Sequence, residues 1–87
     1  MKLKEQYLIS KNVDGTISIY DLENDCFYNL NSTASIVFEN IEFSVGEVAK
    51  QIALEFDVNE NDIILEIEET FQQLKEVFFY QDEHTAL

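Results

Sequence analysis

Residues that could carry chemistry are few in this sequence, and they lie far apart. Cys26 and His84 are the only cysteine and the only histidine among its 87 residues. A nucleophilic cysteine needs a neighbouring base or cation to lower the pKa of its thiol, and neither stands close to Cys26 in the sequence. We therefore interpret Cys26 as a small strand residue, and no catalytic triad or phosphate-binding loop can be assembled around it.

A second candidate for chemistry is the acidic run from Asp57 to Glu68, whose spacing resembles that of a calcium-binding loop. Asp62, however, stands at the position where such a loop turns sharply and needs glycine. The same residues suit the start of a helix, because Asn59 or Asn61 can cap it and Asp62 interacts favourably with the helix dipole. We interpret the run as a helix start, and the sequence predicts no metal and no cofactor.

Acidic residues dominate the charge of the chain. There are 18 Asp and Glu residues against five Lys and no Arg, and the formal net charge is −13. A field of this sign repels nucleic acids and anionic lipids and favours basic partners. Because no apolar stretch approaches the roughly 20 residues that span a bilayer, we expect a cytoplasmic protein that binds neither nucleic acid nor membrane.

Length and hydrophobicity predict one folded domain. The chain is 46% hydrophobic, which favours a packed core over a disordered state. The domain should cover residues 1–87, with a flexible tail at about 81–87, and should fold alone or as a homodimer. Its single cysteine permits no internal disulfide.

The elements that position any site begin with three short strands. Tyr7-Leu8-Ile9 and Thr16–Tyr20 flank the turn residues Asp14-Gly15, which predicts a hairpin. A polar turn at 23–25 then leads to a third strand, Cys26–Leu30. The sequence therefore predicts an antiparallel meander whose third strand lies near an edge.

Three helices should follow, which makes the fold α+β. The first is expected at about 32–41 with Ile36, Val37 and Phe38 inward, and the second opens with a capping box made by Ser44 and Glu47. The apolar face of the second helix is predicted to hold Val48, Ala49, Ile52 and Phe56. The third should begin near 59–61 with an apolar core stripe formed by Ile64, Ile67, Phe71, Leu74 and Phe78, widened by Ile63 and Val77.

One flank of the third helix mixes apolar and polar residues outside this stripe: Leu65, Glu68, Gln72, Lys75 and Phe79. Such a flank is expected to be partly exposed and adhesive. The aromatic run Phe78-Phe79-Tyr80 can cap the core, extend a groove or pack against a second copy. The helix carboxylates, among them Glu66, Glu69 and Glu76, are interpreted as a solvated face, with a grip on basic residues of a partner as the alternative.

The third strand carries aromatic residues on both faces, with Tyr28 and Leu30 on one side and Phe27 on the other. If no further strand pairs with it, a second polypeptide can supply both the covering groups and the hydrogen-bond partner. This pattern indicates peptide binding rather than catalysis.

Several short motifs occur in a characteristic order: Asp21-Leu22, Phe27-Tyr28-Asn29-Leu30-Asn31, Thr33-Ala34, Ile36, Phe38, Ser44-Val45, Glu47-Val48-Ala49, Phe56-Asp57-Val58 and Asp62-Ile63. Through them nearly the whole chain resembles the PqqD family, named after the D protein of pyrroloquinoline-quinone biosynthesis. Two sites depart from the family pattern. Asn24-Asp25 replaces a glycine turn, which these residues tolerate, and 77–80 replaces a Gly-Leu pair at the end of the third helix.

The resemblance implies a winged-helix-like arrangement of three antiparallel strands and three helices. It implies a protein without enzymatic activity that binds the leader segment of a ribosomally made precursor peptide, as a strand beside the third strand and against the third helix. The other partner would be a separate maturation enzyme, such as a peptidase, a cyclase or a radical enzyme. The expected peptide-binding residues are Cys26, Phe27, Tyr28, Asn29, Leu30, Leu65, Glu68, Gln72, Lys75 and Phe79.

The charge of the third helix argues against a role in DNA binding. A winged-helix transcription factor needs a cationic recognition helix, whereas this helix carries Lys75 alone against several carboxylates. An acidic interaction module that neutralises a basic partner stays open as the alternative. The opposite flank of the helix, at Ile63 and Thr70, is the alternative wall for the peptide.

Overall fold

The computed structural model describes residues 1–81 and has the predicted α+β architecture, a three-stranded antiparallel sheet followed by three helices. The winged-helix-like description fits this order of elements. His84 and, apart from Gln81, the tail expected at about 81–87 lie outside the described residues. The elements are β1 (Tyr7–Lys11), β2 (Ile17–Asp21), β3 (Cys26–Asn29), α1 (Ser32–Glu39), α2 (Val45–Phe56) and α3 (Glu60–Phe78).

The sheet has the order β1-β2-β3, so β2 is central and β3 is an edge strand, as predicted. Both turns use residues that accept a left-handed backbone. Gly15 has a φ of 91° in the β1–β2 turn, and Asp25 has a φ of 52° before β3. Asp25 thus fills the place where a glycine would be expected, at the modest cost that aspartate bears in this region.

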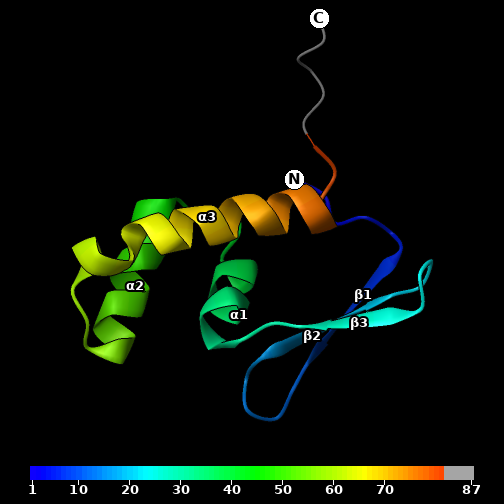
Figure 1. Cartoon of the computed structure of the whole chain (residues 1–87), viewed down its shortest axis with the longest axis horizontal. Helices are drawn as coiled ribbons and strands as arrows, with labels where there is room; N and C mark the ends of the chain where they lie inside the picture. Colours follow the sequence, from blue (N-terminus) through cyan, green and yellow to red (C-terminus); the bar gives the residue numbers. More distant parts are fainter. Residues whose placement is uncertain (82–87) are drawn as a thin grey trace, which may run out of the picture.

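The sheet lies beside the helices rather than beneath them (Figure 1). α3 runs across α2 and α1, and its C-terminal end reaches the sheet. The core is continuous across this junction, with buried members from β2, α1, α2 and α3: Ile17, Ile19, Val37, Val48, Ala49, Ile52, Ile67, Phe71, Leu74 and Phe78. Within residues 1–81, no helix has the length and apolar character needed to cross a bilayer.

Each helix begins at a side-chain cap. Asn31 accepts a hydrogen bond from the backbone N–H of Ala34 at 2.8 Å, and Asn59 accepts one from Asn61 at 2.8 Å. The capping box of Ser44 and Glu47 is present at the start of α2, which confirms that prediction. These caps satisfy backbone donors that have no partner inside the helix.

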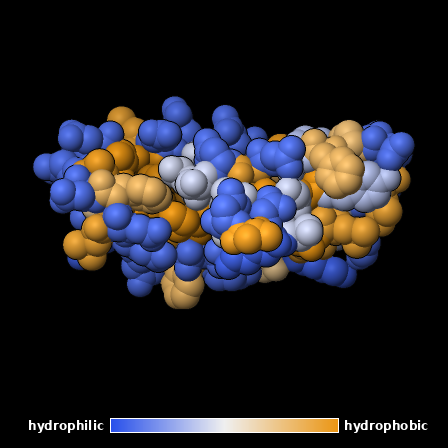
Figure 2. Space-filling model, turned by 90° about the horizontal axis from the view of Figure 1, so that it is seen from below, coloured by the Kyte–Doolittle hydropathy of each residue, from blue (hydrophilic) through white to orange (hydrophobic). Residues whose placement is uncertain are grey.

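Two apolar residues that were expected to face inward are exposed instead. Phe56 is the last residue of α2, because the left-handed conformation of Asp57 ends the helix there. The ring of Phe56 is exposed. Val77 lies at the edge of the α3 stripe and is also exposed. Figure 2 shows apolar side chains gathered at both ends of the molecule, over the helices and over the sheet.

The hydroxyl of Ser35 in α1 links the sheet to the helices. The N–H of Leu30 donates to the carbonyl of Ile17 at 2.9 Å, as in a β2–β3 ladder. The N–H of Ile17, however, donates to Ser35 Oγ at 2.9 Å, and that hydroxyl donates to the carbonyl of Leu30 at 3.3 Å. Ser35 is buried, so its single oxygen replaces one rung of the ladder away from water.

Replacing Ser35 by alanine should destabilise the protein by about 1–3 kcal/mol, because a buried N–H and a buried carbonyl lose their partner. Urea unfolding measures the change, and hydrogen exchange should show faster exchange of the Ile17 amide. Ser32→Ala, at an exposed position of the same helix, is the matched control and should leave the stability and the exchange rate of the Ile17 amide unchanged. Equal stability of the two variants would contradict a structural role for the Ser35 hydroxyl.

A second polar cluster surrounds the buried carboxylate of Asp21 at the end of β2. It accepts hydrogen bonds from Gln6 Nε2 at 3.1 Å, from the N–H groups of Glu23 and Asn24 at 2.9 and 3.1 Å, and from Asn24 Nδ2 at 2.8 Å. The side-chain amide of Asn24 is the largest cause of a lowered pKa of Asp21, and the other donors add to it against the opposing effect of burial. The cluster fixes the turn that leads into β3.

Because the pKa of Asp21 is lower in the folded state, its stabilising contribution is complete above the unfolded-state pKa near 4 and is lost as the pH falls through the lowered value. Asp21→Asn should therefore be less stable than the wild type at pH 7, and the difference in their free energies of unfolding should become smaller below about pH 4. Urea unfolding from pH 7 to pH 3 measures this difference. Glu66→Gln, which removes an exposed carboxylate from α3, should show no comparable loss of stability. A stability difference between Asp21→Asn and the wild type that is constant with pH would contradict the role of the Asp21 carboxylate.

Candidate functional site

Within residues 1–81, no strand pairs with the outer edge of β3. Leu30 donates its N–H to β2, and β2 and β3 pair with Tyr28 opposite Ile19. Since residues of an antiparallel strand alternate in direction, Tyr28 and Cys26 also bond to β2, while Phe27 and Asn29 direct N–H and C=O outward. The edge can therefore pair with one added strand through the backbone of Phe27 and Asn29.

The inner face of β3 adjoins the end of α3 through aromatic rings. The Tyr28 ring meets the Phe78 ring edge to face at 5.1 Å, and Phe78 meets Tyr7 of β1 at 4.9 Å in the same manner. Tyr28 is still partly exposed, whereas Cys26 and Leu30, on the same face, are half-buried. The Tyr28 ring thus provides a partly exposed apolar surface next to the open strand edge.

The side chains of Phe27 and Asn29 point to the opposite, outer face of the sheet. Phe27 is among the most exposed aromatic residues of the described chain, and its ring lies 4.8 Å from that of Tyr20. The five predicted strand residues therefore divide into three roles. Phe27 and Asn29 offer backbone groups to the edge, Tyr28 offers a ring, and Cys26 and Leu30 anchor the strand from inside.

The predicted flank of α3 is exposed over most of its length. Leu65, Glu68 and Gln72 are exposed, and Lys75 is half-buried with its Nζ 5.5 Å from the centre of the Phe71 ring. These residues do not all lie near β3. With a rise of 1.5 Å per residue, Leu65 is about 20 Å along the helix from Phe78, where α3 meets the sheet.

Phe79 was expected on this exposed flank, and that expectation is wrong. Phe79 follows the last residue of α3 with extended backbone angles, φ −117° and ψ 151°, and it is buried. Its ring lies 5.7 Å from that of Phe38. Of the aromatic run at the end of the helix, Phe78 and Phe79 belong to the core, and Tyr80 is exposed.

The reason for this departure is a contact with the start of the chain. Leu3 and Phe79 form an antiparallel bridge, in which the N–H of Lys4 donates to the carbonyl of Phe78 at 2.9 Å and the N–H of Tyr80 donates to Lys2 at 2.8 Å. The bridge straightens the backbone after Phe78 and ends the helix. Helical periodicity carries no signal for a partner 76 positions away in the sequence.

The acidic run that resembles a calcium loop begins at Asp57, the C-cap of α2, and continues into the first turns of α3. Asn59 caps α3, and Glu60 and Asp62 lie in its first turn, as the helix-start interpretation predicted. Within residues 1–81, no three His, Cys, Asp or Glu side chains lie close enough together to hold a metal ion.

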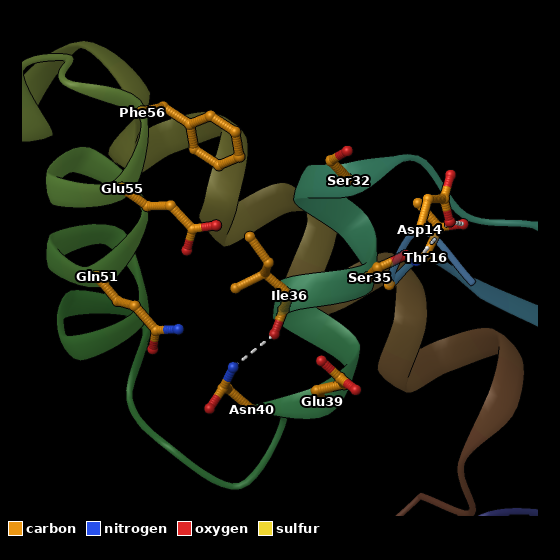
Figure 3. A pocket seen from close by; sticks show the side chains of 11 residues that line it. Asp14, Thr16, Ser32, Ser35, Ile36, Glu39, Asn40, Gln51, Glu55 and Phe56 are labelled. Carbon is orange, nitrogen blue, oxygen red and sulfur yellow. Dashed lines mark hydrogen bonds between the residues drawn. The ribbon is translucent and has the colours of Figure 1, made fainter. Parts of the chain in front are cut away.

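A separate open pocket of about 350 Å³ lies between α1, α2 and the β1–β2 turn (Figure 3). Asn40 Nδ2 donates to the carbonyl of Ile36 within it at 2.8 Å. Its lining is mainly polar and acidic: Asp14, Gly15, Thr16, Ser32, Ser35, Ile36, Glu39, Asn40, Gln51, Glu55 and Phe56. None of the predicted peptide-binding residues lines it, so this pocket is distinct from the β3 edge.

Comparison with solved structures finds the same fold in two peptide complexes. TbiB1 in complex with the TbiA(beta) leader peptide superposes with a TM-score of 0.69 at 18% identity, over 94% of this chain and 100% of that one. Lasso peptide synthetase B1 complexed with the leader peptide gives a TM-score of 0.69 at 22% identity, over 86% of this chain and 89% of that one. At these identities the likeness establishes a shared fold.

Comparison of the sequence itself identifies the family. No curated protein sequence matches the chain significantly. The family described as coenzyme PQQ synthesis protein D (PqqD) matches residues 17–79, from the first residue of β2 to the residue after α3. This match covers well over half of the 87 residues and includes the β3 edge and all three helices. The chain therefore belongs to the PqqD family.

Proposed function

We propose that this protein has no catalytic activity of its own and captures the leader segment of a ribosomally made precursor peptide by strand addition to β3. The observation that carries the proposal is the open β3 edge, with the backbone of Phe27 and Asn29 outward and the Tyr28 ring beside it. An extended peptide that pairs with these groups completes a four-stranded sheet.

Family and fold support the choice of ligand. Both similar structures, TbiB1 and lasso peptide synthetase B1, are complexes with leader peptides, and their fold covers most of this chain. Recognition elements of the PqqD family serve separate modifying enzymes, so the second partner of this protein would be a maturation enzyme such as a peptidase, a cyclase or a radical enzyme. The protein would present the bound precursor to that enzyme.

Affinity and selectivity would come from different parts of the site. Backbone hydrogen bonds at β3 accept any extended peptide, whereas side-chain pockets along α3 distinguish one leader from another. A leader that touches both the β3 edge and Leu65 must extend about 20 Å, which takes roughly six residues in a strand. Between these two points α3 carries Glu68, Gln72 and Lys75, which would contact the leader side chains in the middle of the bound segment.

Calorimetry with a synthetic leader segment of any precursor peptide encoded by a neighbouring gene should show binding with a Kd of about 1 μM or tighter. The mass of the precursor should remain unchanged after incubation with the protein alone. Raising the salt concentration tests the alternative of an acidic module. Strand addition beside apolar rings should persist at 0.5 M salt, where the Debye length is only about 4 Å, whereas simple charge neutralisation should weaken strongly. Absence of binding to every such leader would refute the proposal.

A proline at position 27 tests the strand-addition geometry directly. Phe27→Pro removes an N–H that faces the open edge, where proline is tolerated, while Phe27→Ala keeps that N–H and removes the ring. We expect Phe27→Pro to lower leader affinity at least about tenfold relative to Phe27→Ala, with similar thermal unfolding of the two variants. Equal leader affinity would place the peptide elsewhere, with the free edge of β1 as the next candidate.

A further inference from the structure

Among residues 1–81, no helix covers the outer face of the sheet. Its residues form two rows across the three strands, given by the register of the sheet: Leu8, Tyr20 and Phe27 in one row, and Ser10, Ser18 and Asn29 in the other. None of the six is buried. The first row is apolar and aromatic, with Leu8 53% and Phe27 67% exposed, and it contributes to the apolar surface at this end of the molecule.

None of these six residues is charged, although 26% of the residues in the chain are charged. Ser18 in the second row makes hydrogen bonds to uncharged groups. Its Oγ donates to Asn29 Oδ1 at 2.8 Å and accepts a hydrogen bond from Asn12 Nδ2 at 3.1 Å. Depletion of charge together with enrichment in aromatic residues is typical of the centre of a protein interface. A solvated face of such an acidic chain would be expected to carry carboxylates.

Charge and size determine which partner fits the outer face. The phenol of Tyr20 donates a hydrogen bond to Asp25, which places a carboxylate at the border of the apolar row. A second copy would bring another −13 charges and the same carboxylate to the contact. Two strands of five residues and one of four form a face of at most roughly 15 by 17 Å, far below the about 800 Å² per partner of a stable interface. A partner that makes a small apolar contact, bordered by basic residues, fits both the size of this face and the carboxylate at its border.

We propose that the outer face of the sheet is the surface that contacts the modifying enzyme, through an apolar patch on that enzyme bordered by lysine or arginine. This inference rests on the proposed function, because the enzyme is identified as the one that acts on the captured precursor. Leu8 lies two strands away from the open edge, about 10 Å at the spacing of a sheet. Leader and enzyme can therefore bind at the same time, through the edge of the sheet and through its outer face.

The test uses the full chain, the purified enzyme that modifies the bound precursor, and the synthetic leader. Leu8→Asp should lower the affinity for the enzyme at least about tenfold and leave leader affinity within about twofold. Leu8→Thr introduces an uncharged β-branched residue, which suits a strand, and should weaken enzyme binding in the same direction. Leu54→Asp, which changes a 79% exposed leucine of α2, is the control of equal charge and should alter neither affinity.

Each outcome decides one point. Unchanged enzyme affinity in folded Leu8→Asp, or in Leu8→Thr if the aspartate variant does not fold, overturns the inference. Equal loss of leader affinity overturns it as well, because the face would then belong to the leader site. A wild-type dimer that Leu8→Asp dissociates in sedimentation experiments would assign the face to a second copy. If the enzyme binds through Leu8 but no leader binds, the proposed function fails while the docking surface stands.

Discussion

The hydroxyl group of Ser35 is the contact on which the arrangement of the sheet and the helices depends. In this fold the sheet extends to one side of the helices, so few groups join the two parts. Ser35 Oγ bonds to Ile17 and to Leu30, which are the first residue of β2 and the residue after β3. One oxygen atom thereby fixes the distance between the two strands at the point where the chain enters α1. The aromatic contacts of Phe78 with Tyr7 and Tyr28 make the corresponding connection from α3.

The proposed leader site follows from these two connections. A strand edge binds a peptide well only when it is held in one position, because ordering the edge on binding would cost free energy. Ser35 fixes one end of β3, and the turn around Asp21 fixes the other. The edge between them is short and preformed, and the Tyr28 ring on the inner face of β3 packs against Phe78 at the end of α3.

Local rules of sequence predicted most of the fold, including the edge position of β3 on which the proposed site is built. Alternation in β2, Asp14-Gly15 in the turn and the Ser44 capping box each depend on neighbours within a few residues, and each prediction is confirmed. The exposed positions of Phe56 and Val77 and the burial of Phe79 could not be obtained in this way. Phe79 is set by its bridge to Leu3, and the roles of Ser35 and Asp21 depend on groups brought together by the fold.

The brevity of β3 has a consequence for the tendency of the protein to aggregate. An unpaired strand edge is a template for aggregation, and a protein that keeps one open for a ligand is exposed to this hazard while the ligand is absent. β3 is four residues long, so it offers few backbone groups to another copy. The net charge of −13 adds mutual repulsion. An edge this short, on a chain this acidic, can accept a peptide and still resist growth into fibrils.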